Sequence, residues 1–155
     1  MTAGCLCALP AAAEQPFSIG GKITVTKVSD GDSLRSGRLK IRLHGIDAPE
    51  LKQTCTDPAG ALWSCGRAAR DAMADIAMTA PLRCDLMDVD RYGRLVMRCL
   101  AGGTDIAAHL VASGLALAYR RYSMDYVEAE TRARETKRGM WAGDFEAPWD
   151  WRRRD

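Results

Sequence analysis

Residues 30–50, DGDSLRSGRLKIRLHGIDAPE, constrain the fold more than any other part of the sequence. In residues 39–44, apolar side chains alternate with lysine, arginine and histidine, which is the period of a half-buried strand. Ser33-Leu34 predicts a short partner strand, and Ser36-Gly37 predicts the turn between the two strands. The segment is therefore expected to form a hairpin with one face toward a core.

Two pairs of acidic residues, Asp30 with Asp32 and Asp47 with Glu50, lie at the two ends of this hairpin. If the apolar side chains face the core, Arg42 lies on the opposite face, beside Asp32. Hard divalent cations of the calcium type prefer several oxygen ligands, which carboxylates supply. The segment thus carries the groups needed to bind a cation and a phosphate together.

Each of these features also has a plainer interpretation. Asp30-Gly31 is a common hairpin-turn signal, and an arginine on an exposed strand face is usually solvated. Residues 47–50, Asp-Ala-Pro-Glu, could begin a helix with proline in its first turn. Only the combination of these features favours a binding site.

The length of 155 residues predicts one domain with its own core. A net charge of only +2 gives no strong argument for or against nucleic acid as a partner. Basic clusters at Arg120-Arg121 and at residues 152–154 either lie near an anionic ligand or form a solvated surface, and the sequence leaves both open.

Residues 1–13, MTAGCLCALPAAA, carry no charge and end in alanines, which is typical of the back half of a secretory signal cleaved after Ala13. A positively charged segment before the apolar run is missing, and residues 2–5 resemble a lipoprotein cleavage site only faintly. The run is also too short to span a bilayer. We therefore expect residues 14–155 to form one mature domain that is periplasmic or secreted, without stable membrane insertion.

In an oxidising compartment, the cysteines Cys55, Cys65, Cys84 and Cys99 are expected to form disulfides. Three pairings are open, and we favour Cys55 with Cys65, which closes a polar loop, and Cys84 with Cys99, which ties two strands of a hairpin. Zinc is the competing interpretation, but the sequence has no C-x-x-C motif and only two histidines.

Periodicity elsewhere predicts the remaining elements. Strands are expected at residues 22–28, 82–87 and 95–100. Helices are expected at residues 67–79 and 124–138, with a short one between them, capped by Thr104 or Asp105 and ended by Gly114. The tail tryptophans at 141, 149 and 151 are expected to pack onto the body. Five strands interleaved with three helices predict an α+β domain with a small barrel.

Several ordered motifs resemble the staphylococcal nuclease (thermonuclease) family: DGDS, IRLHGIDAPE, DRYGR and DIAAHLVASGLALAY. The likeness covers about residues 19–141, and the ending FEAPWDWRRR resembles exported bacterial members. The resemblance implies a five-stranded OB-type barrel with three helices. It also implies a calcium-dependent nuclease that cleaves DNA and RNA phosphodiesters and leaves a 3′-phosphate. We expect a monomer, although the sequence leaves the oligomeric state open.

The resemblance further implies a role for each motif position. Asp32 and Asp47 would be calcium ligands, with the backbone carbonyl of Ala48 as a third. Glu50 would be the general base or would orient the attacking water. The guanidinium groups of Arg42 and Arg94 would hold the scissile phosphate, because each can form forked bonds to phosphate oxygens.

The sequence departs from the family pattern at two positions, where Ala48 and Ser33 replace the frequent threonines. Neither change removes a ligand, since Ala48 would use its carbonyl and serine keeps a hydroxyl group. Tyr92, Tyr122 and Tyr119 are candidates for stacking on bases, with core or surface packing as the alternative.

A second function class remains open, namely a non-catalytic OB-type module that binds single-stranded nucleic acid or a protein partner. A third interpretation, an envelope-associated domain that docks through its tail, has only the tryptophans and arginines of that tail to support it.

Overall fold

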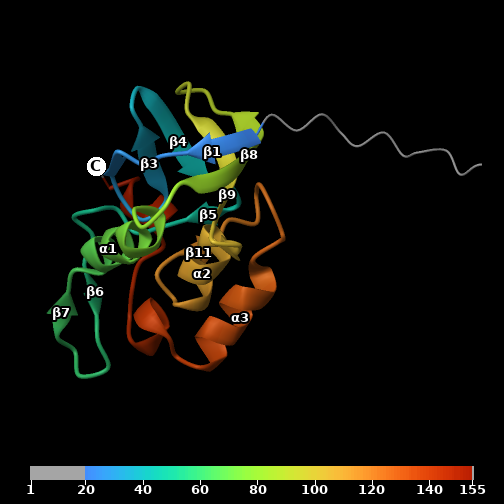
Figure 1. The fold of residues 1–155 in the computed structure, drawn as a ribbon. Coiled ribbons are helices and arrows are strands. Elements are labelled where there is room, and N and C mark those ends of the chain that lie inside the picture. The colour runs from blue at the N-terminus through green and yellow to red at the C-terminus, as the bar shows by residue number, and fades with distance from the viewer. Residues whose placement is uncertain (1–19, 155) are drawn as a thin grey trace, which may run out of the picture.

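A curled sheet dominates the computed structural model, which describes residues 20–154 (Figure 1). Its strands follow the order β1 (Gly20–Ile23), β8 (Leu82–Val89), β9 (Leu95–Ala101), β4 (Leu39–Leu43), β3 (Ser33–Ser36) and β2 (Lys27–Val28), and β10 (Thr104–Asp105) pairs with β9. All of these pairs are antiparallel except β4 with β9. Two small sheets join β5 (Ile46–Asp47) to β11 (Leu117–Ala118) and β6 (Cys55–Thr56) to β7 (Leu62–Trp63).

Four of the helices gather on one side of this sheet, namely α1 (Cys65–Ala77), α2 (Ile106–Ala112), α3 (Val127–Glu135) and the 3-10 helix η1 (Gly139–Ala142) (Figure 1). The short α4 (Pro148–Trp151) lies beside the sheet, near β3. Helix α2 contacts β9, α1 and α3, so it lies at the centre of the helical layer. The expected α+β class with an OB-like, partly closed barrel is confirmed.

Boundaries differ from the sequence predictions in several places. The strand expected at residues 22–28 divides into β1 and β2, because its first part pairs with β8 and its second part pairs with β3. The turn falls at residues 37–38, since Ser36 still pairs with Leu39. Helix α3 covers only Val127–Glu135 of the predicted residues 124–138, and Lys137, two residues beyond its end, adopts a positive φ of 52°.

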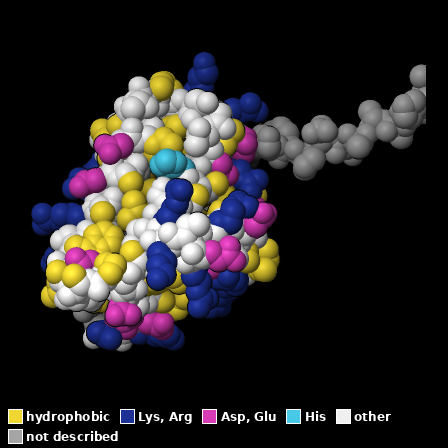
Figure 2. Space-filling model, turned by 90° about the horizontal axis from the view of Figure 1, so that it is seen from below, with side chains coloured by type: hydrophobic (Ala, Val, Ile, Leu, Met, Phe, Trp, Pro, Cys, Tyr) yellow, Lys and Arg dark blue, Asp and Glu magenta, His cyan; other side chains and the backbone are white. Residues whose placement is uncertain are grey.

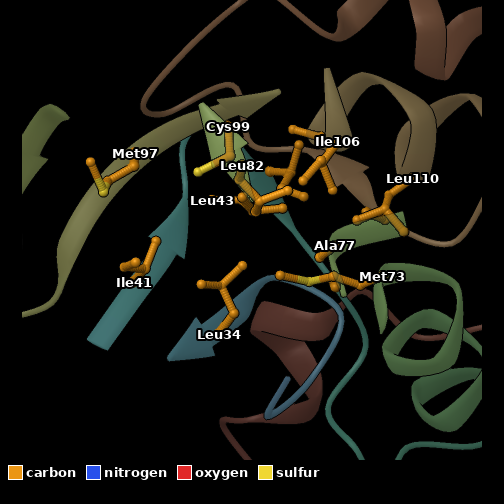
Figure 3. Close-up of a cluster of buried hydrophobic side chains, with 14 of the residues drawn as sticks. Leu34, Ile41, Leu43, Met73, Ala77, Leu82, Met97, Cys99, Ile106 and Leu110 are labelled. Atoms are coloured by element: carbon orange, nitrogen blue, oxygen red, sulfur yellow. The ribbon is translucent and has the colours of Figure 1, made fainter. Parts of the chain in front are cut away.

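The core fills the space between the curled sheet and the helices (Figure 3). Leu34, Ile41 and Leu43 are each 1% exposed, because the alternation of β3 and β4 turns these side chains inward. Helices α1 and α2 contribute apolar side chains at helical spacing, among them Met73, Ala77, Ile106 and Leu110.

Both expected disulfides are present. Cys84 and Cys99 lie directly opposite each other on β8 and β9, with an S–S distance of 2.06 Å. Cys55 and Cys65 are joined at 2.00 Å and connect β6 to the first turn of α1. The first bridge lies within the main core, and the second belongs to a smaller cluster with Leu117 and Met140.

The C-terminal segment returns to the body, as expected from its tryptophans. Trp141 and Trp149 pack against the smaller cluster, and the Trp149 ring stacks on Tyr119 with 5.5 Å between centroids. Figure 1 shows this segment ending beside the sheet, close to β3. The tail therefore reaches the part of the barrel that carries the acidic residues.

The face seen in Figure 2 mixes Lys and Arg side chains with Asp and Glu. Among residues 20–154, no helix is both long enough and apolar enough to cross a membrane. The predicted signal remnant at residues 1–13 lies outside the described residues.

Candidate functional site

Asp32, Asp47 and Arg42 meet at the edge of the barrel. One nitrogen of Arg42, Nη2, lies 3.0 Å from Asp32 Oδ2 and 2.8 Å from Asp47 Oδ1. The other, Nη1, donates to Asp32 Oδ1 at 3.1 Å. The two carboxylates therefore converge on one guanidinium group, although they lie fifteen residues apart in sequence.

A backbone N–H and a serine hydroxyl hold Asp32 in this position. The Ala48 N–H donates to Asp32 Oδ2 at 3.1 Å, and the Ser33 hydroxyl donates to Oδ1 at 2.8 Å. A Cβ atom on Gly31 would lie 2.7 Å from the side chains of both Ala48 and Ala69. Glycine is therefore required at this position, because only its bare backbone lets the Asp30–Asp32 loop pack this closely.

The electrostatics of the site is set by burial. Asp32 is 3% exposed and Asp47 is fully buried. Burial raises the pKa of Asp32 above its usual value, and Arg42 opposes this only in part. Burial likewise raises the pKa of Asp47. For Arg42, burial acts to lower the pKa, but the two aspartates outweigh it and the pKa is raised. At both carboxylates, the cost of burying the charge thus outweighs the attraction of the nearby guanidinium groups.

Glu50 lies on the loop that follows β5, and its position is fixed by two buried contacts. Gln53, fully buried, accepts from the Glu50 N–H at 3.2 Å and donates to the Glu146 carbonyl oxygen at 2.7 Å. Gly66, in the first turn of α1, approaches so closely that a Cβ there would lie 1.8 Å from the Glu50 carbonyl oxygen. The Glu50 side chain remains 37% exposed and reaches solvent.

Arg152 is a third arginine of the site, which the sequence analysis placed only in a basic cluster. Its Nη2 lies 2.6 Å from Asp47 Oδ2, and its Nη1 lies 2.7 Å from Glu50 Oε1. These two carboxylates raise the pKa of Arg152, although burial acts to lower it. The short helix α4, begun by Pro148 after Ala147, delivers this side chain.

Arg94 lies directly before β9, in the hairpin loop that joins β8 to β9. Its Nε lies 2.6 Å from Asp90 Oδ2. Slight burial acts to raise the pKa of Asp90, but hydrogen bonds from Arg94 and from the Tyr92 N–H lower it. In the parallel pairing of β4 and β9, Arg42 is opposite Val96. Arg94, two residues before Val96, therefore shares the face of Arg42.

The three candidate tyrosines have different environments. Tyr92 is 63% exposed, with Arg91 and Arg94 over its ring at 4.8 and 5.6 Å. Tyr122 is 62% exposed. Tyr119 stacks against Trp149 and contacts Tyr122 edge-on, with 5.0 Å between their centroids. Tyr92 and Tyr122 are thus open to a ligand, whereas Tyr119 also packs within the protein.

The donor chemistry of the two aspartates fits a hard divalent cation. The side-chain atoms that could coordinate a cation are all carboxylate oxygens, and the two carboxylates are buried beside each other. Within residues 20–154, no cluster of three or more His, Cys, Asp or Glu side chains is arranged around one metal position. A cation here would therefore depend on these two carboxylates, with backbone or water oxygens completing its shell.

Most of the chain matches the model of a known protein family. The model described as staphylococcal nuclease homologue matches residues 40–143, more than half of the chain. The chain belongs to the staphylococcal nuclease family. The matched range includes Arg42, Asp47, Glu50 and Arg94, whereas Asp32 and Arg152 lie outside it.

Three relatives illustrate this membership. Micrococcal nuclease of Shigella flexneri is 32% identical over 147 residues, covering 83% of this chain and 79% of that protein. An uncharacterized endonuclease of Haemophilus influenzae is 30% identical over 139 residues, covering 84% and 72%. The succinoglycan biosynthesis protein ExoI of Rhizobium meliloti is 34% identical over 117 residues, covering 74% and 61%. The chain spans less than two thirds of the length of the first curated relatives it matches.

Proposed function

We propose that this protein is a calcium-dependent nuclease that hydrolyses phosphodiester bonds of DNA or RNA and leaves 3′-phosphate products. The observation that carries the proposal is the convergence of Asp32 and Asp47 on Arg42. Glu50 is joined to Asp47 through Arg152, and Arg94 lies next to β4, on the outward face that also carries Arg42. Relatives named as nucleases support the choice of chemistry.

Asp32 and Asp47 would hold the calcium ion, together with the carbonyl oxygen of Ala48. A bound calcium ion would polarise the phosphate and lower the pKa of nearby water. Burial of the two carboxylates supports this role, because desolvation raises the pKa of both groups despite the nearby arginines, and a bound cation would offset that cost.

Glu50 is the group best placed to act on the attacking water. Its carboxylate is partly exposed, and its backbone is fixed by Gln53 and Gly66. It would orient the water and accept a proton as the oxygen bonds to phosphorus and the bond from phosphorus to the 5′-oxygen breaks. A rigid backbone with a solvent-accessible side chain suits that task.

Arg42 and Arg94 would bind the phosphate that reacts. Negative charge builds on the equatorial oxygens during phosphoryl transfer, so catalysis depends mostly on positioning and charge stabilisation. The Arg42 side chain is 16% exposed and the Arg94 side chain 26%, so each guanidinium group combines a fixed position with access to substrate.

Glu50→Gln and Arg94→Ala test this function against that of a binding module. With calcium, each variant is expected to digest plasmid DNA at least about a hundredfold more slowly than the wild type, because a proton acceptor or a charge-stabilising group is lost. Both side chains are partly exposed, so both variants are expected to keep their fold, which circular dichroism would check. Arg67→Ala, on the exposed face of α1, is a matched control that should digest at the wild-type rate.

If both variants digest plasmid DNA at the wild-type rate, the roles assigned to Glu50 and Arg94 are wrong. If the wild type binds single strands without cleaving them, the non-catalytic OB module becomes the better interpretation. The ExoI relative, named for succinoglycan biosynthesis, is the observation that keeps this second candidate open.

We also propose that the protein works outside the cytoplasm. The two disulfides support this, because such bonds persist in oxidising compartments. Fractionation of cells expressing the full chain is expected to find the protein in the periplasm or medium with no free thiol at Cys84.

A further inference from the structure

Three exposed basic residues lie in one row across neighbouring strands. Lys27 on β2 is directly opposite Arg35 on β3, and Arg35 is directly opposite Lys40 on β4. Opposed residues in adjacent strands project from the same face of a sheet. The three side chains therefore stand side by side on one face, at a strand spacing of about 4.8 Å.

This face is the outer face of the barrel. Val28, Leu34 and Ile41 alternate with the three basic residues along their strands and are buried in the core. Lys27, Arg35 and Lys40 are correspondingly exposed to solvent.

No carboxylate in residues 20–154 forms a salt bridge with Lys27, Arg35 or Lys40. Like charges directly opposite each other destabilise a sheet. Some arginines elsewhere have such partners, for example Arg120, which pairs with Glu130 at 2.6 Å. The row thus keeps three adjacent cations whose repulsion an anionic ligand would relieve.

The row continues into the proposed active site. Arg42 is the next outward-facing residue after Lys40 on β4. On the other side of β4, Leu95 is opposite Ile41, so Arg94, directly before β9, lies level with Lys40. A chain whose phosphate contacts Arg42 and Arg94 can therefore extend across β4, β3 and β2, the strand face that OB folds use for oligonucleotides.

We propose that Lys27, Arg35 and Lys40 form a track that binds the phosphate backbone of single-stranded nucleic acid next to the scissile bond. The choice of occupant rests on the proposed function. A single file of cations at regular spacing, continuous with two phosphate-binding arginines, matches a polyphosphate chain and carries no base specificity.

The test compares two matched double variants. Arg35→Thr/Lys40→Thr removes two opposed cations of the track, and threonine suits an exposed strand position. Lys22→Thr/Arg83→Thr removes the same charge from another directly opposed, exposed pair, on β1 and β8. Binding of a labelled oligonucleotide of about 12 nucleotides, within the usual range of OB-fold site sizes, is measured in chelator between about 50 and 200 mM salt. KM for the same oligonucleotide is measured with calcium.

The track variant is expected to bind about tenfold more weakly at low salt, and its salt slope should fall by about 1.4 because two phosphate contacts are lost. Its KM should rise by a similar factor, and the control should match the wild type. The track variant should still cleave a dinucleotide at the wild-type rate, since that substrate reaches only Arg42 and Arg94. It should also melt at or above the wild-type temperature, because charge repulsion is relieved.

If the track variant matches the control in both binding and KM, the inference is wrong while the proposed function stands. If the wild type neither binds nor cleaves the oligonucleotide, both fail. A track variant that also loses dinucleotide cleavage would overturn the inference, because it would show a defect in the site itself.

Discussion

Asp32 is the residue at which stability and the proposed activity conflict most directly. Its carboxylate is 3% exposed and its pKa is raised by burial, so the charged form costs stability at neutral pH. Asparagine can still accept the hydrogen bond from the Ala48 N–H, and Arg42 keeps Asp47 as a partner. The site therefore holds a charge that the fold alone does not favour.

We predict that Asp32→Asn raises the free energy of unfolding by about 1 kcal/mol without calcium, while it abolishes digestion. Urea unfolding in chelator measures the first effect, and plasmid digestion measures the second. Asp71→Asn, at an exposed position on α1, is the control. It should change the free energy of unfolding by no more than about 0.5 kcal/mol and the rate of digestion by no more than about twofold. A less stable Asp32→Asn variant would contradict this account of the buried charge.

Arg152 supplies positive charge to the same carboxylates from the far end of the chain. Its guanidinium group lies between Asp47 and Glu50, so it repels any cation held there. We predict that Arg152→Ala tightens calcium binding by about tenfold, equivalent to about 1.4 kcal/mol. Calorimetric titration of the protein without substrate measures this directly.

Arg154→Ala is the matched control for Arg152, because Arg154 pairs with Glu146 and not with the site. Its calcium affinity should equal that of the wild type. Equal affinities in all three proteins would mean that Arg152 does not influence the cation, and weaker binding in Arg152→Ala would mean that it supports the site.

Of these two site arginines, Arg42 could be placed from the sequence and Arg152 could not. Alternation along residues 39–44 was enough to place Arg42 on the face of Asp32. Arg152 could not be placed, because it lies 105 residues from Asp47 and no local periodicity reports which surface the tail meets. Long-range contacts of this kind depend on tertiary packing.

At the scale of elements, Tyr126 links three parts of the fold. Its hydroxyl, just before α3, donates to Asp105 Oδ2 at 3.0 Å, and Asp105 caps α2 by accepting from the Ala108 N–H. Arg98 on β9 lies over its ring at 6.0 Å. Burial raises the pKa of Tyr126 to about 12.

This shift predicts a loss of stability in alkali. The folded protein keeps the Tyr126 proton between the ordinary pKa of 10.0 and about 12, whereas the unfolded chain releases it. The contribution of the Tyr126 hydroxyl to the free energy of unfolding is complete below pH 10. It is lost as the pH rises toward 12, at about 1.4 kcal/mol per pH unit. Tyr126→Phe should remove this part of the slope, which urea unfolding between pH 9 and about 11.5 would measure. An unchanged slope would contradict the assignment.

Elements with strong periodicity were predictable, and those defined by pairing were not. The alternation of β4, β8 and β9 and the helical spacing of α1 sufficed to predict them within a few residues. The two-residue strands β5 and β11 were missed, since they exist only because Ile46 and Asp47 meet Leu117 and Ala118. The split between β1 and β2 also reflects a change of partner strand, which no local pattern encodes.

For the whole molecule, the distribution of charge matters more than its sum. A net charge of +2 gave no argument about partners. The fold separates the charges, with two buried carboxylates at the barrel edge and Lys27, Arg35 and Lys40 in a row beside them. Topology, which brings β2, β3, β4 and β9 side by side, creates this separation.

The central claim is that this arrangement hydrolyses phosphodiester bonds and needs calcium to do so. It is tested most directly by incubating a 5′-labelled single-stranded oligonucleotide with the protein, with calcium or with a chelator, and weighing the products by mass spectrometry. We predict cleavage only with calcium, and products that carry a 3′-phosphate. Equal cleavage in chelator, or no cleavage in either condition by the folded protein, would contradict the account.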